Sequence, residues 1–400
     1  MHSEMKYLID LMLILAASSG GAWLAKRLNQ PQIVGQILGG VLIGSSILGI
    51  VEQSEFIGKL SEIGVIVLMF ITGLETSLSE LKASAERSAA IAIGGIVLPF
   101  AMGFLSIMLL KENFMISEAV FLGVILTATS MGVTVKILAE FRALQSKQGV
   151  SVLGAAVIDD IVGIMILSVA LGAFGKSTAS LWMLLMKIAI FFVIVIFAGE
   201  WISTAVNRNI RILKELKSKF LLPISISLIL LFAITASEFG MAAIIGAYFV
   251  GVILSTTQMK HRITHEVEKF GTGFFIPIFF VNIGLSVNMT MVGKYFTLAI
   301  AITFVGILSK VIGSGIGARI SGFDYLSSLQ IGVSMVPRAE VALIVSNIAL
   351  KAGLIGEDIF VGVILLVIVS SVVSPMLYKG LEQRKKKTSK LLKDAKKKVA

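Results

Sequence analysis

Two adjacent carboxylates, Asp159 and Asp160, interrupt an uncharged run that extends from Gln148 to Gly175. Eleven uncharged residues precede the pair and fifteen follow it, so a helix through this run holds both acids near the middle of a bilayer. A carboxylate at that depth is costly, and its default interpretation is an ion or proton site. A polar pair that only joins helices is disfavoured, because one Asn or Ser would do that at lower cost.

The composition fixes the class of protein. The chain has 400 residues, of which 56% are hydrophobic and 15% charged, and its mean hydropathy is +0.95. These values exclude a soluble domain and predict an all-α polytopic membrane protein. Cys is absent, and His2, His261 and His265 have no metal-ligand partner at a suitable spacing. We therefore expect no cofactor and no nucleic-acid partner, with the lipid bilayer as the surroundings.

Helix-length apolar runs predict thirteen transmembrane spans. The first, at 7–25, follows Glu4 and precedes Lys26 and Arg27, which argues against a signal peptide. The predicted spans are 7–25, 33–50, 57–77, 88–110, 115–135, 148–174, 180–205, 220–237, 239–257, 270–287, 295–318, 325–350 and 358–378.

The distribution of basic residues predicts the orientation. With the N-terminus outside, cytoplasmic loops hold sixteen Lys and Arg and the outer segments hold six. The positive-inside rule then places the C-terminus in the cytoplasm of a multi-pass protein in the cell (inner) membrane. The tail, residues 379–400, agrees with this orientation because it has ten Lys or Arg against two acids. We interpret the tail as a solvated basic anchor, with binding of anionic lipid as a weaker alternative.

Two of the predicted spans contain helix-breaking sequences. The fifth places Thr129, Ser130 and Thr134 around a glycine at membrane depth, and the twelfth contains Pro337 followed by Arg338 and Glu340. Proline removes a backbone donor and clashes with the preceding turn, so the helix should kink or open there. Opened backbone is tolerated in a membrane only where protein or water covers it, which marks both breaks as a candidate ion pathway. We expect Arg338 and Glu340 to neutralise each other or nearby helix ends.

The breaks lie seven spans apart, and an odd offset gives each span of the first half an oppositely directed partner in the second. Spans one to six and eight to thirteen are therefore predicted to form inverted repeats around the seventh span. Interruptions at corresponding positions of inverted repeats point to a transporter whose binding site lies near the membrane midplane. We attribute most glycines, including Gly313, Gly315 and Gly317, to helix packing.

A single cation, Lys310, lies within the eleventh span. Asp159 is twelve residues from Lys147 and Lys310 is nine from Arg319, each counted from the predicted inner flank. At about 1.5 Å per residue the two depths differ by only ~5 Å, which a lysine side chain can bridge. Neighbouring residues of a helix point about 100° apart, so Lys310 cannot serve both acids equally. One Asp is expected to pair with it, and the other to bind a cation.

The run from Ala155 to Asp160, together with Gly306 to Lys310 and Pro337 to Val341, resembles the two-aspartate branch of the monovalent cation/proton antiporter superfamily, and most of all the NapA-type sodium/proton antiporters. Further similar motifs cover nearly the whole chain in order. They are Arg27 to Pro31, Gly73 to Glu75, Ala128 to Thr134 and Pro277 to Phe280. One departure is Ala339, where the family often has Gly; it bears on local helix packing only.

The resemblance implies an NhaA-like antiporter fold with two broken, crossing helices. A moving core would comprise about 88–174 and 295–378, and a dimer scaffold about 1–87 and 175–294. In such proteins the first Asp pairs with the Lys and the second binds the ion. This implies Na⁺ at Asp160, a proton-linked salt bridge between Asp159 and Lys310, and a homodimer that serves pH homeostasis. The expected activity is electrogenic Na⁺(Li⁺)/H⁺ antiport by alternating access.

Three alternatives remain open at this point. A K⁺/H⁺ antiporter of the same superfamily is the nearest, because cation preference has no sequence signature here. Antiporters of that kind with glutathione-gated regulation commonly carry Gln-Asp where this chain has Asp159 and Asp160. An intramembrane aspartyl protease, the enzyme alternative, needs its two Asp on separate helices. A scaffold or sensor is the third alternative, and measurement of ion flux would separate it from a transporter.

Overall fold

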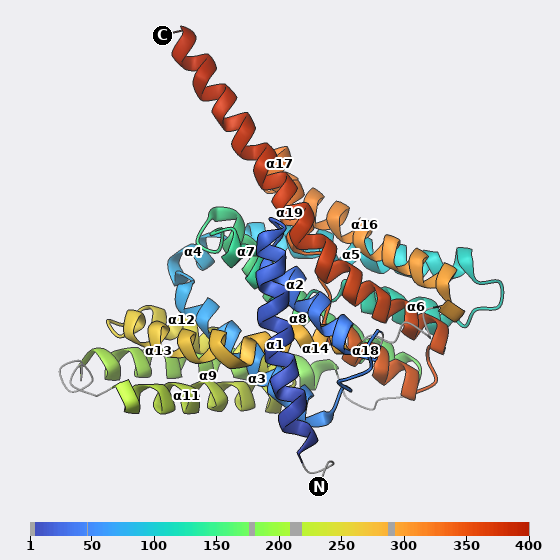
Figure 1. Cartoon of the computed structure of the whole chain (residues 1–400), viewed down its shortest axis with the longest axis horizontal. Helices are drawn as coiled ribbons and strands as arrows, with labels where there is room; N and C mark the ends of the chain where they lie inside the picture. The colour runs from blue at the N-terminus through green and yellow to red at the C-terminus, as the bar shows by residue number, and fades with distance from the viewer. Residues whose placement is uncertain (1–4, 46, 176–180, 209–217, 287–292, 400) are drawn as a thin grey trace.

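The structure, a computed structural model, describes all residues except 1–4, 46, 176–180, 209–217, 287–292 and 400, and the described residues form helices and no strands (Figure 1). The helices of the first half are α1 (Lys6–Arg27), α2 (Gln32–Ile43), α3 (Glu55–Glu75), α4 (Leu78–Ala83), α5 (Ala85–Leu110), α6 (Ile116–Thr127), α7 (Met131–Glu140), α8 (Lys147–Ala173) and α9 (Leu181–Arg208). Those of the second half are α11 (Ser218–Glu238), α12 (Ala243–Ser255), α13 (Lys260–Phe270), the π-helix η1 (Gly271–Phe275), α14 (Ile276–Leu285), α16 (Phe296–Ile320), α17 (Tyr325–Ser334), α18 (Glu340–Lys351) and α19 (Glu357–Val399).

Every predicted span coincides with a helix or a pair of helices. Nine helical segments of the described chain are long and apolar enough to cross a membrane, and α2, α12 and α18 are apolar but shorter. The second predicted span, 33–50, was too long, because α2 ends at Ile43 and the chain then turns at Gly49, which has a positive φ of 63°. An all-helical membrane protein is thus confirmed, whereas the number of thirteen crossings stays a prediction.

The helices pack in two groups. In the first, α5 packs against α6, α8 and α16, and α16 packs against α17 and α19. In the second, α2 packs against α1 and α14, while α3 and α11 pack against α12. Contacts between the groups are fewer; α2 touches α19, and α3 touches α7. Figure 1 shows α16 and α5 on one side of the molecule and α9, α11 and α13 on the other.

The segment that contains His261 and His265, between the predicted spans 239–257 and 270–287, is a helix, α13. Ile263 and Val267 lie one turn apart and are buried, so a single apolar edge holds this polar helix against its neighbours. The chain continues without interruption through η1 into α14. Pro277 has no N–H to complete the α-helical ladder at this junction, and the five-residue π-turn just before it accommodates that loss.

The tail is not a separate segment, because α19 extends through it to Val399. Tyr378 is buried, and its ring lies 5.0 Å from that of Phe141. Glu382 accepts a hydrogen bond from the Gln330 amide at 2.9 Å, and Lys385 donates to Ser327 at 3.0 Å. The first two turns of the tail therefore bind the first half of α17.

Candidate ion-binding site

The two predicted helix breaks meet inside the protein. Residues 128–130 separate α6 from α7, and residues 335–339 separate α17 from α18. The Ser130 N–H donates to the Pro337 carbonyl at 2.7 Å, and the Thr134 hydroxyl donates to the Ser334 carbonyl at 2.8 Å. Thr129, Ser130 and Thr134 are all buried. The opened backbone of each break is therefore covered by the other, as irregular structure at membrane depth requires.

Lys310 of α16 forms an ion pair with Asp159 of α8, with 2.6 Å between Nζ and Oδ2. The ammonium also donates to the carbonyls of Gly95 at 2.7 Å and Thr127 at 2.8 Å, so each of its three hydrogens has an acceptor. Lys310 and Asp159 are 0% and 1% exposed. A lysine can remain charged away from water when each hydrogen of its ammonium has an acceptor and a carboxylate lies beside it.

Only one of the two carboxylate oxygens of Asp159 accepts hydrogen bonds from the described residues. Its Oδ2 atom accepts the hydrogen bonds from Lys310 and from the Thr129 hydroxyl, the latter at 2.9 Å. Its Oδ1 atom is buried and accepts no hydrogen bond from any residue that the structure describes. One oxygen thus remains available for a water, a proton or an ion, while the other fixes the side chain between α16 and the α6–α7 break.

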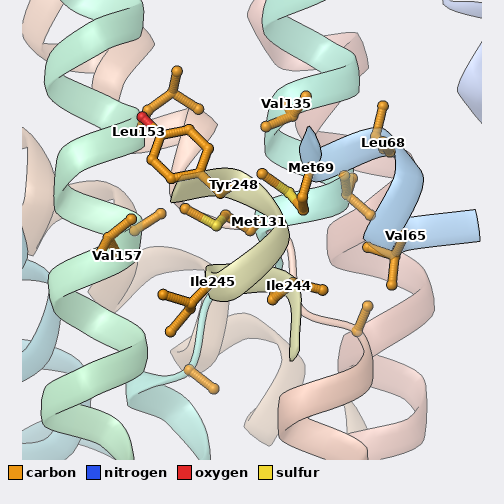
Figure 2. Close-up of a cluster of buried hydrophobic side chains, with 14 of the residues drawn as sticks. Val65, Leu68, Met69, Met131, Val135, Leu153, Val157, Ile244, Ile245 and Tyr248 are labelled. Carbon is orange, nitrogen blue, oxygen red and sulfur yellow. The ribbon is translucent and has the colours of Figure 1, made fainter. Parts of the chain in front are cut away.

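Asp160 is buried and lies on a different face of α8 from its neighbour. Leu153, Val157 and Asp160 recur at intervals of four and three, so they share one face of the helix. Figure 2 shows Leu153 and Val157 in a hydrophobic cluster built from α3, α7, α8 and α12. Its labelled members are Val65, Leu68, Met69, Met131, Val135, Leu153, Val157, Ile244, Ile245 and Tyr248. Asp160 therefore lies on the face that α8 turns toward the boundary between the two packing groups.

Arg338 occupies the other half of the crossing and is fully buried. Its guanidinium donates to the Leu126 carbonyl at 2.6 Å, to the Gly306 carbonyl at 3.4 Å and to the Val336 carbonyl. Leu126 lies in the last turn of α6, and Val336 lies two residues beyond the end of α17. Since the C-terminal ends of helices carry partial negative charge, Arg338 neutralises the two half-helix ends that meet there. The expectation that Arg338 serves nearby helix ends is confirmed; the side chain of Glu340 lies outside the described residues.

Several residues that hold the site were missed from the sequence. Arg338 donates its backbone N–H to the Ser370 hydroxyl, its carbonyl accepts from Ser371, and Ser374 donates to the Val333 carbonyl. These three serines of α19 stand at spacings of one and three in an otherwise apolar span, and that pattern was the available signal. The carbonyls of Gly95 and Thr127 had no such signal, because every residue has a carbonyl.

Close packing of α5 against α16 brings the Gly95 carbonyl within reach of the Lys310 ammonium. A Cβ atom added to Gly313 of α16 would lie 2.2 Å from the Gly94 carbonyl oxygen, and one added to Gly317 would lie 2.2 Å from that of Ala90. The packing role expected for Gly313 and Gly317 is therefore confirmed, whereas Gly315 has only ordinary contacts. With α5 and α16 this close, Gly95 of α5 reaches the Lys310 ammonium directly.

The groups at the crossing that can bind an ion are oxygen ligands. Two carboxylates, several hydroxyls and the carbonyls of opened backbone converge there, which suits a hard cation or a proton. No group of three or more His, Cys, Asp or Glu that could hold a metal ion occurs within the described ranges.

Comparison with known proteins agrees with this geometry. Residues 14–379 match the family described as sodium/hydrogen exchanger, transmembrane. The chain is 36% identical to the Na⁺/H⁺-K⁺ antiporter GerN of Bacillus cereus, over 97% of this chain and 100% of that protein. It is 35% identical to a Na⁺/H⁺ antiporter of Enterococcus hirae, over 94% and 98%. The chain therefore belongs to the sodium/hydrogen exchanger family.

The fold is likewise similar to that of a solved antiporter. The sodium proton antiporter MjNhaP1 of Methanocaldococcus jannaschii, in its structure at pH 8, superposes with a TM-score of 0.68 at 20% sequence identity, over 94% of this chain and 97% of that one. The family and the fold together define a multi-pass membrane protein of the antiporter type.

Proposed function

We propose that this chain is an electrogenic antiporter that exchanges Na⁺ or Li⁺ for H⁺ at Asp160. The observation that carries the proposal is the buried aspartate pair at the crossing of two broken helices, with Asp159 bound to Lys310 at 2.6 Å. Asp160 is the principal cation ligand, because Lys310 already neutralises its neighbour. Thr129, Ser130, Thr134, Arg338 and Glu340 shape the pathway that leads to it.

Competition at one site produces the exchange. A carboxylate that has bound a proton loses its attraction for a cation, so a proton and a bare cation exclude each other at Asp160. Movement of the site between two openings then couples the two fluxes. The Asp159–Lys310 pair carries a second proton when it opens, which makes two protons per Na⁺ and the exchange electrogenic.

The moving part is the group of helices that contains the site. We assign the core to about 88–174 and 295–378 and the scaffold to about 1–87 and 175–294, which the two packing groups support. The scaffold forms the homodimer contact. The protein lies in the cell membrane with its N-terminus outside and its C-terminus in the cytoplasm, where it serves pH homeostasis.

A second candidate, K⁺/H⁺ exchange, is favoured by one observation. The relative GerN, 36% identical to this chain, is named a Na⁺/H⁺-K⁺ antiporter. A protease is disfavoured, because the two carboxylates are neighbours on α8 and one is held by Lys310.

The substitution Asp160→Asn tests the assignment, because Asn fills the same space without charge or a titratable proton. The purified protein would be reconstituted in liposomes with an imposed pH gradient, and its dissipation measured on addition of Na⁺, Li⁺ or K⁺. We expect the wild type to respond to Na⁺ and Li⁺, and the variant to fold but to lose at least nine-tenths of the rate. Asn207→Ala, at the exposed end of α9, is the control. Near-normal Na⁺-driven flux through Asp160→Asn would exclude Asp160 as the principal ligand, and a response to K⁺ alone would favour the second candidate.

A further inference from the structure

Two adjoining hollows open between α4, α9 and α12, away from the aspartate pair. The larger has a volume of about 680 Å³ and lies between α9 and α12, and the smaller has about 490 Å³ and lies at the end of α3. Both are lined by Leu78, Lys82 and Thr256, so they form one continuous cleft. We name it the α9–α12 cleft.

The smaller part of the cleft is polar and basic. Two lysines line it, together with five hydroxyl side chains: Lys82, Lys260, Thr76, Ser77, Ser79, Ser255 and Thr256. Neither lysine forms an ion pair with any described residue. Two ammonium groups without an ion-pair partner among the described residues provide charged donors for the acceptor oxygens of a phosphate group. The hydroxyls of Thr76, Ser255 and Thr256 donate to backbone carbonyls of their own helices, so the lysines are the main donors.

The larger part of the cleft is apolar along most of its length. Phe192 and Ile196 of α9 line it together with Phe249 and Ile253 of α12, and the rings of Phe192 and Phe249 meet edge to face with 5.3 Å between their centroids. At Gly199 the two helices approach closely, since a Cβ atom added there would lie 2.9 Å from the Ile253 side chain. An apolar slot of this kind suits a hydrocarbon chain.

An exposed tryptophan places the polar end of the cleft at the membrane surface. Trp201 is 74% exposed on α9, directly after Glu200, which lines the cleft. Exposed tryptophan on a membrane helix is typical of the headgroup level. Lys82 and Lys260 also belong to the segments that the charge distribution assigns to the cytoplasmic side, where anionic lipids concentrate.

We propose that the α9–α12 cleft binds one anionic phospholipid. The phosphate group lies against Lys82 and Lys260, and one acyl chain occupies the slot between α9 and α12. Charge complementarity selects the lipid, because the polar end presents two cations and most of the slot is apolar. The Glu200 carboxylate of α9 repels the phosphate group and so limits the affinity for the lipid. This inference does not depend on which cation the protein transports.

Binding can be followed without measuring transport. The chain has three tryptophans, and in the variant Trp23→Phe with Trp182→Phe the only tryptophan fluorescence is that of Trp201. Phosphatidylglycerol with brominated acyl chains, added to this purified protein in detergent, is expected to quench Trp201 saturably. Brominated phosphatidylcholine with the same chains is the zwitterionic comparison, and inorganic phosphate tests a soluble ligand.

The variants give the proposal its sharpest test. Lys82→Gln and Lys260→Gln should each raise the apparent Kd for phosphatidylglycerol about fivefold, and together about 25-fold. Glu200→Gln should lower it, and Lys59→Gln, at the other end of α3, should leave it unchanged. Each variant is first shown to be monodisperse with a wild-type melting temperature. Equal affinity for the two lipids, an unchanged Kd in the double lysine variant, or full displacement by millimolar inorganic phosphate would each overturn the proposal.

Discussion

At the scale of single residues, the site depends on one cation that serves three acceptors. The Lys310 ammonium binds Asp159 and the carbonyls of Gly95 and Thr127, and no hydrogen is left over. The ion pair is therefore a junction between α16, α8, α5 and the α6–α7 break rather than an isolated contact. Because these partners are fixed, the ammonium releases its proton only when they rearrange together. This property suits the proton carrier that we propose.

Removing one partner of this pair should cost more than removing both. Lys310→Ala or Asp159→Ala leaves a buried, uncompensated charge and is expected to destabilise the protein by about 3–5 kcal/mol. The double variant Asp159→Asn with Lys310→Gln should be milder, because no charge remains. Thermal unfolding in detergent measures this, with Lys59→Ala as an exposed lysine control. Equal loss in single and double variants would show that the ion pair contributes little.

The same double variant separates a structural role from proton transport. If the pair carries a proton, exchange through Asp160 becomes electroneutral or stops. The measurement is flux in liposomes with and without an imposed membrane potential. A double variant that keeps the voltage dependence of the wild type would show that Asp159 and Lys310 are not proton carriers, and Glu340 would be the next acid to examine.

At the scale of elements, the central feature is the crossing of two broken helices. Pro337 and the hydroxyl-rich Thr127–Thr134 segment predicted both breaks correctly. Proline alone does not mark a break, because Pro99, Pro223 and Pro375 lie inside the continuous helices α5, α11 and α19. The partners of the breaks could not be predicted. Ser370, Ser371 and the carbonyl of Leu126 come from other helices, and only the folded chain brings them to Arg338.

Arg338 should not tolerate replacement, because its planar fork reaches carbonyls on two sides of the crossing. Arg338→Gln leaves buried carbonyls without donors and removes the charge that opposes the ends of α6 and α17. We expect a loss of several kcal/mol, at about 1–3 kcal/mol for each unsatisfied group. Arg338→Lys keeps the charge but not the planar guanidinium, so its stability should lie between that of the wild type and that of Arg338→Gln. Thermal unfolding, with Arg319→Lys at the exposed end of α16 as the control, would decide; a stable Arg338→Gln protein would contradict the role.

At the scale of the whole molecule, charge patterning in the sequence predicted the helices that carry the site but not how the two groups of helices touch. An ionisable residue inside an apolar run is conspicuous, and so Asp159, Asp160 and Lys310 could be found. Contacts at the ends of helices are not conspicuous, because charged residues are common there. Glu140, at the end of α7, is such a case, since its carboxylate accepts the Gln32 backbone N–H at the start of α2 at 2.7 Å. This contact joins the proposed core to the proposed scaffold.

The Glu140–Gln32 contact should break during transport if the core moves against the scaffold. Because the chain has no native Cys, Gln32→Cys with Glu140→Cys can be joined selectively by a short bifunctional thiol reagent. We expect the joined protein to lose Na⁺/H⁺ exchange, and the unjoined double variant to retain a substantial part of it. The control joins Ser18→Cys to Gln36→Cys, whose native side chains lie 3.0 Å apart on α1 and α2 within the scaffold. That link should leave exchange unchanged. Full activity with Gln32 and Glu140 joined would mean that the two groups do not separate at this contact, and the site would then have to open by motion within the core itself.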